Sequence, residues 1–319
     1  MMRSTSPSLI VGARIVVLSV SIVGCSAASN ASGEPAVTTA APSATPAPSS
    51  AAVSNDLVAD IDIGEGRTMH LLCVGPVASG KPTVIFESGL GGDAGQWSDV
   101  LHALDPTVRA CAYDRAGDGQ SPALGTPDGR TTADQVDDLH ALLSAAEIPP
   151  PYVLVGYSIG GWNLLVHADK HPDDILGAVM VEVRPPAASR RWAAAMPPEA
   201  SGEPEVVTLT RTDPETFEQD PNGNPEGLLL DASASEVLAT KGLGDRPLVV
   251  LAGTDTAIIS EGFDEVLAAK VLDIWWELQD ELAAASTNGS LRKIEGANHE
   301  LPFTHPDEVA AAISEVLGN

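Results

Sequence analysis

The sequence has little positive charge. Its 17 Lys and Arg residues face 44 Asp and Glu residues, which gives a formal net charge of −27. Nucleic-acid binding needs lysine and arginine to neutralise phosphates, so this balance argues against a nucleic-acid partner. The same excess disfavours binding to anionic lipid surfaces. Acidity alone bears on solubility and says nothing about chemistry.

Two kinds of binding motif are also missing. No His-Glu-x-x-His pattern occurs, so the sequence predicts no metal centre of that kind. Glycines stand at 89, 91 and 92, but they lack the Gly-x-Gly-x-x-Gly spacing of a dinucleotide loop, and no Lys-Ser pair follows them. We therefore expect no cofactor.

Residues 1–24 are typical of an export signal. Arg3 and Arg14 supply positive charge, and the apolar run at 15–23 is too short to remain as a membrane-spanning helix. The run ends in Ile-Val-Gly-Cys at 22–25, which resembles the lipobox of bacterial lipoproteins. That resemblance implies cleavage before Cys25, a lipid anchor on its thiol and a place in the cell envelope. An ordinary secretory signal with an incidental cysteine is the alternative.

Residues 25–54 are rich in Ala, Ser, Thr and Pro and have no aromatic residue or hydrophobic period. Such a segment cannot bury enough apolar surface to offset the entropy of ordering, so we expect a disordered tether. Residues 55–319 suit one large domain.

Within that domain, predicted strands alternate with helices. Short apolar runs predict strands at 57–63, 69–74, 83–87, 108–113, 175–183, 247–252 and 290–294, and one more directly before residue 156. Thr132 and Gln135 fit a capping box that opens a helix. The alternation predicts a mostly parallel twisted sheet with helices on both faces. The Pro-rich and acidic stretch at about 184–246 interrupts the rhythm, and we interpret it as a small, partly helical cap over the substrate.

The stretch Gly-Tyr-Ser-Ile-Gly at 156–160 is the most informative motif. It lies between a β-branched apolar run and a helical pattern, which is the context that a nucleophilic serine requires. The glycines permit a strained strand-to-helix turn that exposes the hydroxyl of Ser158 near free helix N–H groups. A plain glycine-rich turn is the alternative.

Four blocks occur in a fixed order: 86–92, 113–121, the serine motif and Gly-Ala-Asn-His at 296–299. In this order the chain resembles the α/β-hydrolase superfamily over residues 57–317. The resemblance implies eight strands with the cap after the sixth, and backbone oxyanion donors at Leu90 and Ile159. It also makes the second and fourth strands neighbours, which implies a Cys73–Cys111 disulfide. Two buried free thiols are the alternative.

The resemblance also implies the chain order nucleophile, acid, histidine. Among seven histidines, His299 follows a late strand and is assigned as the general base. Two acids fit. Glu182 ends the sixth strand, a placement similar to the acid of some haloalkane dehalogenases. Asp255 follows the seventh strand, the commoner location, but it stands two residues after Gly253 where the family usually has three. We favour Glu182 and keep Asp255 open.

These residues predict a serine hydrolase that cleaves a small-molecule carboxylic ester through an acyl-enzyme. A serine in place of an aspartate nucleophile argues against dehalogenase chemistry. An amide-cleaving enzyme similar to proline iminopeptidases is one alternative. A non-catalytic binding lipoprotein is another. The sequence does not indicate an oligomeric state.

Overall fold

The computed structural model describes residues 55–78, 80–125, 128–215, 219–256 and 260–318. The predicted export signal, the tether and Cys25 lie outside these ranges. The strands are β1 (Leu57–Gly64), β2 (Arg67–Val74), β3 (Thr83–Glu87), β4 (Ala110–Tyr113), β5 (Tyr152–Tyr157), β6 (Ile175–Val181), β7 (Leu248–Gly253) and β8 (Gly289–Ile294). The described helices are α1 (Ser98–Ala103), α2 (Thr132–Ala145), α3 (Gly160–Lys170), α4 (Ala188–Ala195), α5 (Glu205–Thr212), α6 (Leu230–Leu238), α8 (Glu265–Ala283), α9 (Leu301–Thr304) and α10 (Pro306–Leu317).

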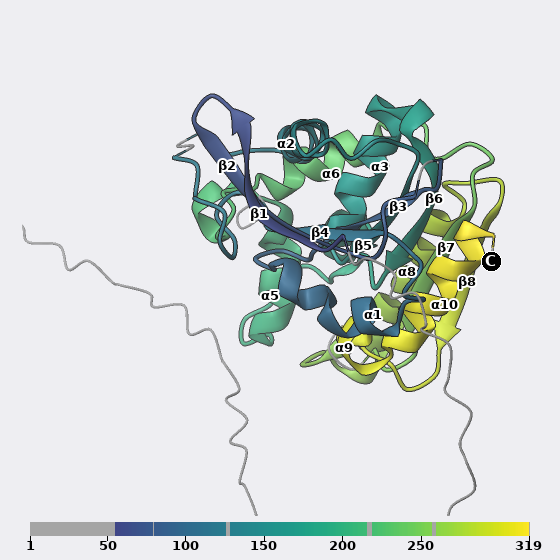
Figure 1. Ribbon diagram of the computed structural model, residues 1–319. Coiled ribbons are helices and arrows are strands. Elements are labelled where there is room, and N and C mark those ends of the chain that lie inside the picture. Colours follow the sequence, from purple (N-terminus) through teal and green to yellow (C-terminus); the bar gives the residue numbers. More distant parts are fainter. Residues whose placement is uncertain (1–54, 79, 126–127, 216–218, 257–259, 319) are drawn as a thin grey trace, which may run out of the picture. The chain divides into compact units, whose positions relative to one another are not determined.

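The eight strands form one sheet in the order β1-β2-β4-β3-β5-β6-β7-β8 (Figure 1). Strand β2 pairs antiparallel with both β1 and β4, and all other pairs are parallel. The predicted fold class is therefore confirmed. Because parallel strands all end at one edge, the loops after β3, β5, β6, β7 and β8 gather there.

Helices cover both faces of the sheet (Figure 1). Alternate residues of a strand enter opposite cores because successive side chains point to opposite faces. On β5, Leu154 packs in the core beneath α2, α3, α6 and α8, while Val153 and Val155 pack in the core beneath α1, α9 and α10. These two buried layers hold the central strands, and with them the serine motif, in place.

Cys73 on β2 and Cys111 on β4 are partners in the antiparallel register, and a disulfide joins them. Both side chains are buried. The bond connects the antiparallel edge of the sheet to its parallel part.

Several predicted boundaries were wrong by a residue or two. The strand predicted to reach residue 183 ends at Val181, because the backbone of Glu182 turns into the left-handed region with φ 49°. The strand predicted from 108 begins at Ala110, since Val108 belongs to a turn. The capping box of α2 uses Thr131 and Asp134. The backbone N–H of Thr132 instead donates to Ser233 Oγ at 3.0 Å.

The segment between β6 and β7 has two parts. Helices α4 and α5 lie in the first part, and α4 packs against α8. Helix α6 lies in the second part and packs against α2 and α3 on the sheet's face. Within the described residues, no helix combines the length and the apolar character needed to cross a bilayer.

Candidate active site

Ser158 stands on a sharp turn between β5 and α3. Its φ of 53° lies in the left-handed region, which costs a non-glycine residue roughly 1–2 kcal/mol. The flanking glycines make the turn possible. A Cβ on Gly156 would lie 2.7 Å from the backbone of Gly161, and one on Gly160 would overlap the carbonyl oxygen of Glu87. The two glycines thus permit a strained turn that exposes the hydroxyl of Ser158.

His299 and Glu182 meet at the carboxyl edge of the sheet. His299 Nδ1 lies 3.4 Å from Glu182 Oε2, and the other carboxylate oxygen accepts a hydrogen bond from the backbone N–H of Gly253. The Glu182 side chain is buried, whereas that of His299 is 38% exposed. A fixed, buried carboxylate behind an accessible imidazole suits a general base, because it selects one tautomer and stabilises the protonated ring.

Tyr157, the residue before Ser158, holds the loop that carries His299 in place. Its hydroxyl donates to the carbonyl oxygen of His299 at 2.8 Å, and the two rings lie 5.1 Å apart between centroids. Burial, together with the charges of Glu182 and Glu300, raises the pKa of Tyr157. The tyrosine therefore stays protonated and keeps donating.

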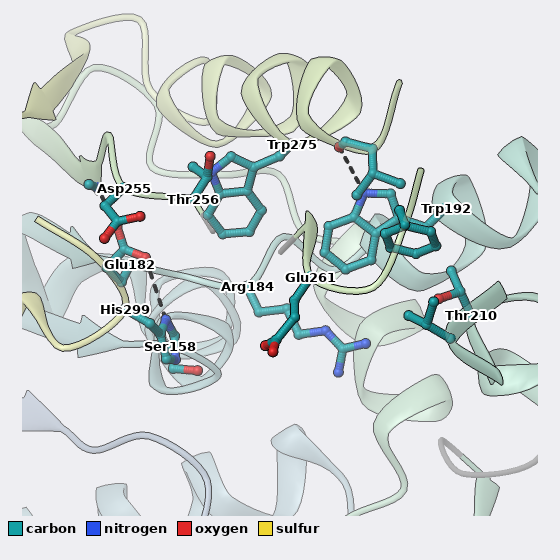
Figure 2. A pocket seen from close by; sticks show the side chains of 14 residues that line it. Ser158, Glu182, Arg184, Trp192, Thr210, Asp255, Thr256, Glu261, Trp275 and His299 are labelled. Carbon is teal, nitrogen blue, oxygen red and sulfur yellow. Dashed lines mark hydrogen bonds and ion pairs between the residues drawn. The ribbon is translucent and has the colours of Figure 1, made fainter. Parts of the chain in front are cut away.

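Asp255, the other predicted acid, lies in the same pocket (Figure 2). Its backbone N–H donates to the carbonyl oxygen of Ala297 at 2.8 Å. The contact with the imidazole that the structure describes comes from Glu182. Ser158, Glu182, Asp255 and His299 all line one cavity of about 360 Å³. Among the described residues no hydrogen bond joins Ser158 to His299, and in ligand-free sites such bonds are often long and tighten when substrate binds.

The loop after β3 carries the predicted oxyanion donor Leu90. Its neighbours are fixed, since the N–H of Gly89 donates to Gln96 Oε1 at 3.0 Å and that of Gly91 to Glu226 Oε1 at 2.8 Å. Within the described part of the chain, the N–H groups of Leu90 and Ile159 donate no hydrogen bond. The loop reaches Ser158, since a Cβ on Gly89 would lie 3.4 Å from the Cβ of that serine. Free N–H donors near the reacting carbonyl are what a developing oxyanion requires.

The side chain of Arg115 holds the backbone of this loop in place. Its guanidinium donates to the carbonyl oxygens of Ser88 and Gly89 at 2.7 and 2.6 Å, and it forms a two-pronged ion pair with Glu226 at 2.7 and 2.8 Å. Burial opposes the charge on Glu226, but Arg115 outweighs it and the pKa of Glu226 is lowered. The pair is therefore charged and orders the backbone around Leu90.

Glu87 and Asp118 lie next to this ion pair. Burial raises the pKa of Glu87, although Arg115 at 3.7 Å acts against the rise. Tyr113 and Asn163 donate to the Glu87 carboxylate at 2.8 and 3.1 Å. Burial, followed by the charge of Glu226, raises the pKa of Asp118 to about 8.

The far wall of the cavity is apolar and aromatic (Figure 2). The rings of Trp192 on α4 and Trp275 on α8 lie 6.4 Å apart, and Trp192 Nε1 donates to the carbonyl oxygen of Val271 at 3.1 Å. Val206 and Phe263 complete the wall. Arg184 and Glu261 also line the cavity. The cavity thus offers an apolar surface some distance from the serine.

Sequence reasoning missed the Arg115–Glu226 pair and the aromatic wall. The two members of the pair are 111 residues apart, and such a distance leaves no local pattern. The long interval between Asp255 and His299, which carries Trp275, was the only signal for the wall. It indicates an insertion without indicating where the insertion packs.

Curated proteins that share part of this sequence include two from bacteria. A putative carbamate hydrolase, RutD, from Yersinia enterocolitica is 33% identical over 117 residues, which cover 37% of this chain and 41% of that protein. The uncharacterized protein YqjL from Bacillus subtilis is 37% identical over 101 residues, covering 31% of this chain and 39% of that protein. The matches span less than half of either relative.

Solved structures with the same fold include a loop variant of the haloalkane dehalogenase DbeA from Bradyrhizobium elkanii. It superposes with a TM-score of 0.57 at 16% identity, covering 83% of this chain and 96% of that chain. An esterase from Thermogutta terrifontis superposes with a TM-score of 0.52 at 21% identity, covering 83% and 98%. At these identities the likeness shows the fold alone.

The family profile described as "Alpha/beta hydrolase family" matches residues 84–312. The matched stretch begins in β3, ends in α10 and contains Ser158, Glu182 and His299. It covers well over half of the 319 residues. The chain therefore belongs to the alpha/beta hydrolase family.

Proposed function

We propose that this protein is a serine hydrolase that cleaves carboxylic esters through an acyl-enzyme. Ser158 is the nucleophile, His299 the general base and Glu182 the acid that orients it. The observation that carries the proposal is a single cavity that contains a strained Ser158 and a histidine whose Nδ1 lies 3.4 Å from a buried carboxylate.

In the first half-reaction, Ser158 Oγ attacks the acyl carbon and His299 Nε2 takes its proton. Negative charge then develops on the carbonyl oxygen, where the N–H groups of Leu90 and Ile159 stabilise it. The tetrahedral intermediate collapses, the C–O bond breaks and His299 returns the proton to the leaving alcohol. Water repeats these steps on the acyl-enzyme and releases the carboxylic acid.

The cavity supports an ester with an apolar group of moderate size. Trp192, Phe263 and Trp275 can bury one side chain of the substrate, and each buried methylene contributes about 0.8 kcal/mol to its binding. Esters are the default because their leaving groups need the least protonation. Amides follow the same route with a poorer leaving group, and carbamates follow it with a less electrophilic carbonyl carbon. The relative named as a putative carbamate hydrolase makes carbamates worth testing.

Labelling with a fluorophosphonate probe tests the nucleophile. Wild-type protein should be labelled, and Ser158→Ala should lose both the label and roughly 10⁴-fold or more of kcat/KM on nitrophenyl esters. An unlabelled wild type without activity would support the binding-protein alternative. Faster cleavage of aminoacyl arylamides than of esters would support the amide-cleaving alternative.

A matched pair of variants identifies the acid. Glu182→Gln keeps the size of the side chain but removes its charge, so kcat should fall about 10³- to 10⁴-fold. Asp255→Asn should change kcat by less than about tenfold. The reverse order of the two losses would assign the acid to Asp255 and refute our assignment.

We further propose that the enzyme acts outside the cytoplasm, anchored by lipid on Cys25. The disulfide supports this location, because such bonds persist in oxidising compartments. Loss of membrane association in Cys25→Ser, measured by fractionation, tests the anchor.

A further inference from the structure

A second cluster of polar side chains lies at the opposite end of α3 from Ser158. His140 comes from α2 and His167 from the last turns of α3. His171 directly follows α3, and Asp174 ends the short 3₁₀ helix Pro172–Asp174 that leads into β6. One ring nitrogen from each of His140 and His167 and one carboxylate oxygen of Asp174 lie within 4.8 Å of one another. None of these residues lines the cavity of Ser158.

His167 is the centre of the cluster and is fully buried. Neither of its ring nitrogens has a hydrogen-bond partner among the described residues. A buried polar ring without partners costs folding free energy, and an apolar side chain of similar size would avoid that cost. The buried ring nitrogens therefore require an explanation that apolar packing does not provide.

We propose that His140, His167 and Asp174 bind one divalent transition-metal ion of the Zn²⁺ type. Two imidazole nitrogens and one carboxylate oxygen form a common set of three protein ligands, and water completes the tetrahedron. Ligands about 2.1 Å from a tetrahedral ion stand about 3.4 Å from each other. The atoms, now within 4.8 Å, must therefore approach by roughly 1.5 Å at most. His140 is exposed, so its ring can make part of this movement within its own plane.

The surroundings suit a bound cation. The ring of His171 stacks on that of His140 with centroids 3.9 Å apart and an interplanar angle of 1°, which holds the His140 ring in its plane. The site lies at the carboxyl end of α3, where the helix dipole favours positive charge. Lys170, whose charge acts on His167, is paired with Asp137. A metal here would tie α2 to the segment between α3 and β6 and act on stability.

Titration of chelator-treated protein with Zn²⁺ alone tests the site, provided that the protein carries no oligohistidine tag. Calorimetry should give one saturable site per chain, and the Tm should rise by several degrees, because the ion binds only the folded state. Co²⁺ in place of Zn²⁺ should give the strong visible absorption of a four-coordinate ion.

Four variants make the test specific. His140→Ala and Asp174→Asn change partly or fully exposed positions, so their metal-free Tm should stay near that of wild type while Zn²⁺ affinity falls at least tenfold. His102→Ala removes an exposed histidine on α1 and should bind like wild type. Ser158→Ala should also bind like wild type, which separates this site from the proposed hydrolase. Absence of saturable binding, or equal affinity in His140→Ala and wild type, would overturn the proposal.

Discussion

The two parts of the segment between β6 and β7 are each tied to the body of the domain by an Arg–Glu pair, but the pairs differ in burial. In the first part, Arg191 on α4 pairs with Glu277 on α8, and both side chains are at least one-third exposed. In the second part, Glu226 pairs with Arg115, and neither side chain is more than 3% exposed. Exposed pairs contribute little, whereas breaking a buried pair strands a charge.

The difference indicates two separate tasks for one insertion. The part around α4 and α5 supplies Trp192 and Val206 to the wall of the cavity, and its ion pair with α8 is exposed to solvent. The part around Glu226 holds the loop of Leu90, so its position bears on the chemistry. We expect changes in the first part to alter which substrates bind and changes in the second to alter stability and turnover.

Breaking the buried pair should have the largest effect. Glu226→Gln removes the charge that Arg115 faces and should lower the free energy of unfolding by about 3 kcal/mol, the low end for such pairs, since Glu87 stays 3.7 Å from the guanidinium. It should also lower kcat by about tenfold or more with little change in KM, because the loop of Leu90, which we propose donates to the oxyanion, loses its support. Urea unfolding and ester kinetics measure both. An unchanged kcat would show that the Arg115–Glu226 pair does not support the loop of Leu90 during catalysis.

Removing the aromatic wall should affect binding instead. Trp192→Ala should raise KM about tenfold for esters with long or aromatic acyl groups and leave short esters nearly unchanged, because only large groups reach the wall. Trp276→Ala serves as the control. That residue is the next along α8 from Trp275, but it contacts Lys293 and does not line the cavity. Equal effects of both variants would contradict the proposed wall.

A change beside the buried pair should alter how stability depends on pH. The folded protein holds a proton on Asp118 up to its pKa of about 8, whereas the unfolded chain releases it near pH 4. Between these values the folded state binds more protons, so the free energy of unfolding falls as pH rises. Asparagine does not titrate, so Asp118→Asn should flatten this fall between pH 5 and 8. A slope identical to that of wild type would show that Asp118 titrates normally.

The smallest effect should come from the exposed pair. Glu277→Gln should lower the free energy of unfolding by less than about 1 kcal/mol, and 0.5 M salt should mask the difference. Since Glu226→Gln makes the same chemical change, thermal melts of the two variants compare burial directly. A loss in Glu277→Gln as large as that in Glu226→Gln would remove the distinction between the two parts.

How much the sequence could predict depended on how far apart in the sequence the interacting residues lie. The turn around Ser158 was predictable because its glycines, strand and helix are local, and the structure contains that turn with its left-handed φ. The antiparallel register of Cys73 and Cys111 followed from a fold that the ordered motifs indicated. The choice between Glu182 and Asp255 was not predictable, since both follow neighbouring strands into one cavity. Which of the two lies 3.4 Å from His299 depends on how the side chains pack, and the sequence does not show that packing.

Two other features of the structure could not be predicted from the sequence. Adjacent threonines at 131 and 132 made two capping boxes possible, and only the extended backbone of Thr131 decided between them. The stacking of His171 on His140 was not predictable, because His140 comes from a different helix and leaves no trace in the sequence around His171.

The Cys73–Cys111 bond makes the choice of production host an experimental variable. It closes a loop across a sequence separation of 38, so a chain made in a reducing cytosol would forgo about 4 kcal/mol of stabilisation on the chain-entropy estimate. Strand β4 leads from Cys111 directly to Arg115. Material that never oxidised would therefore have a less stable fold around the loops that β4 and its neighbours carry, and a poor specific activity would then reflect the thiol state of the preparation.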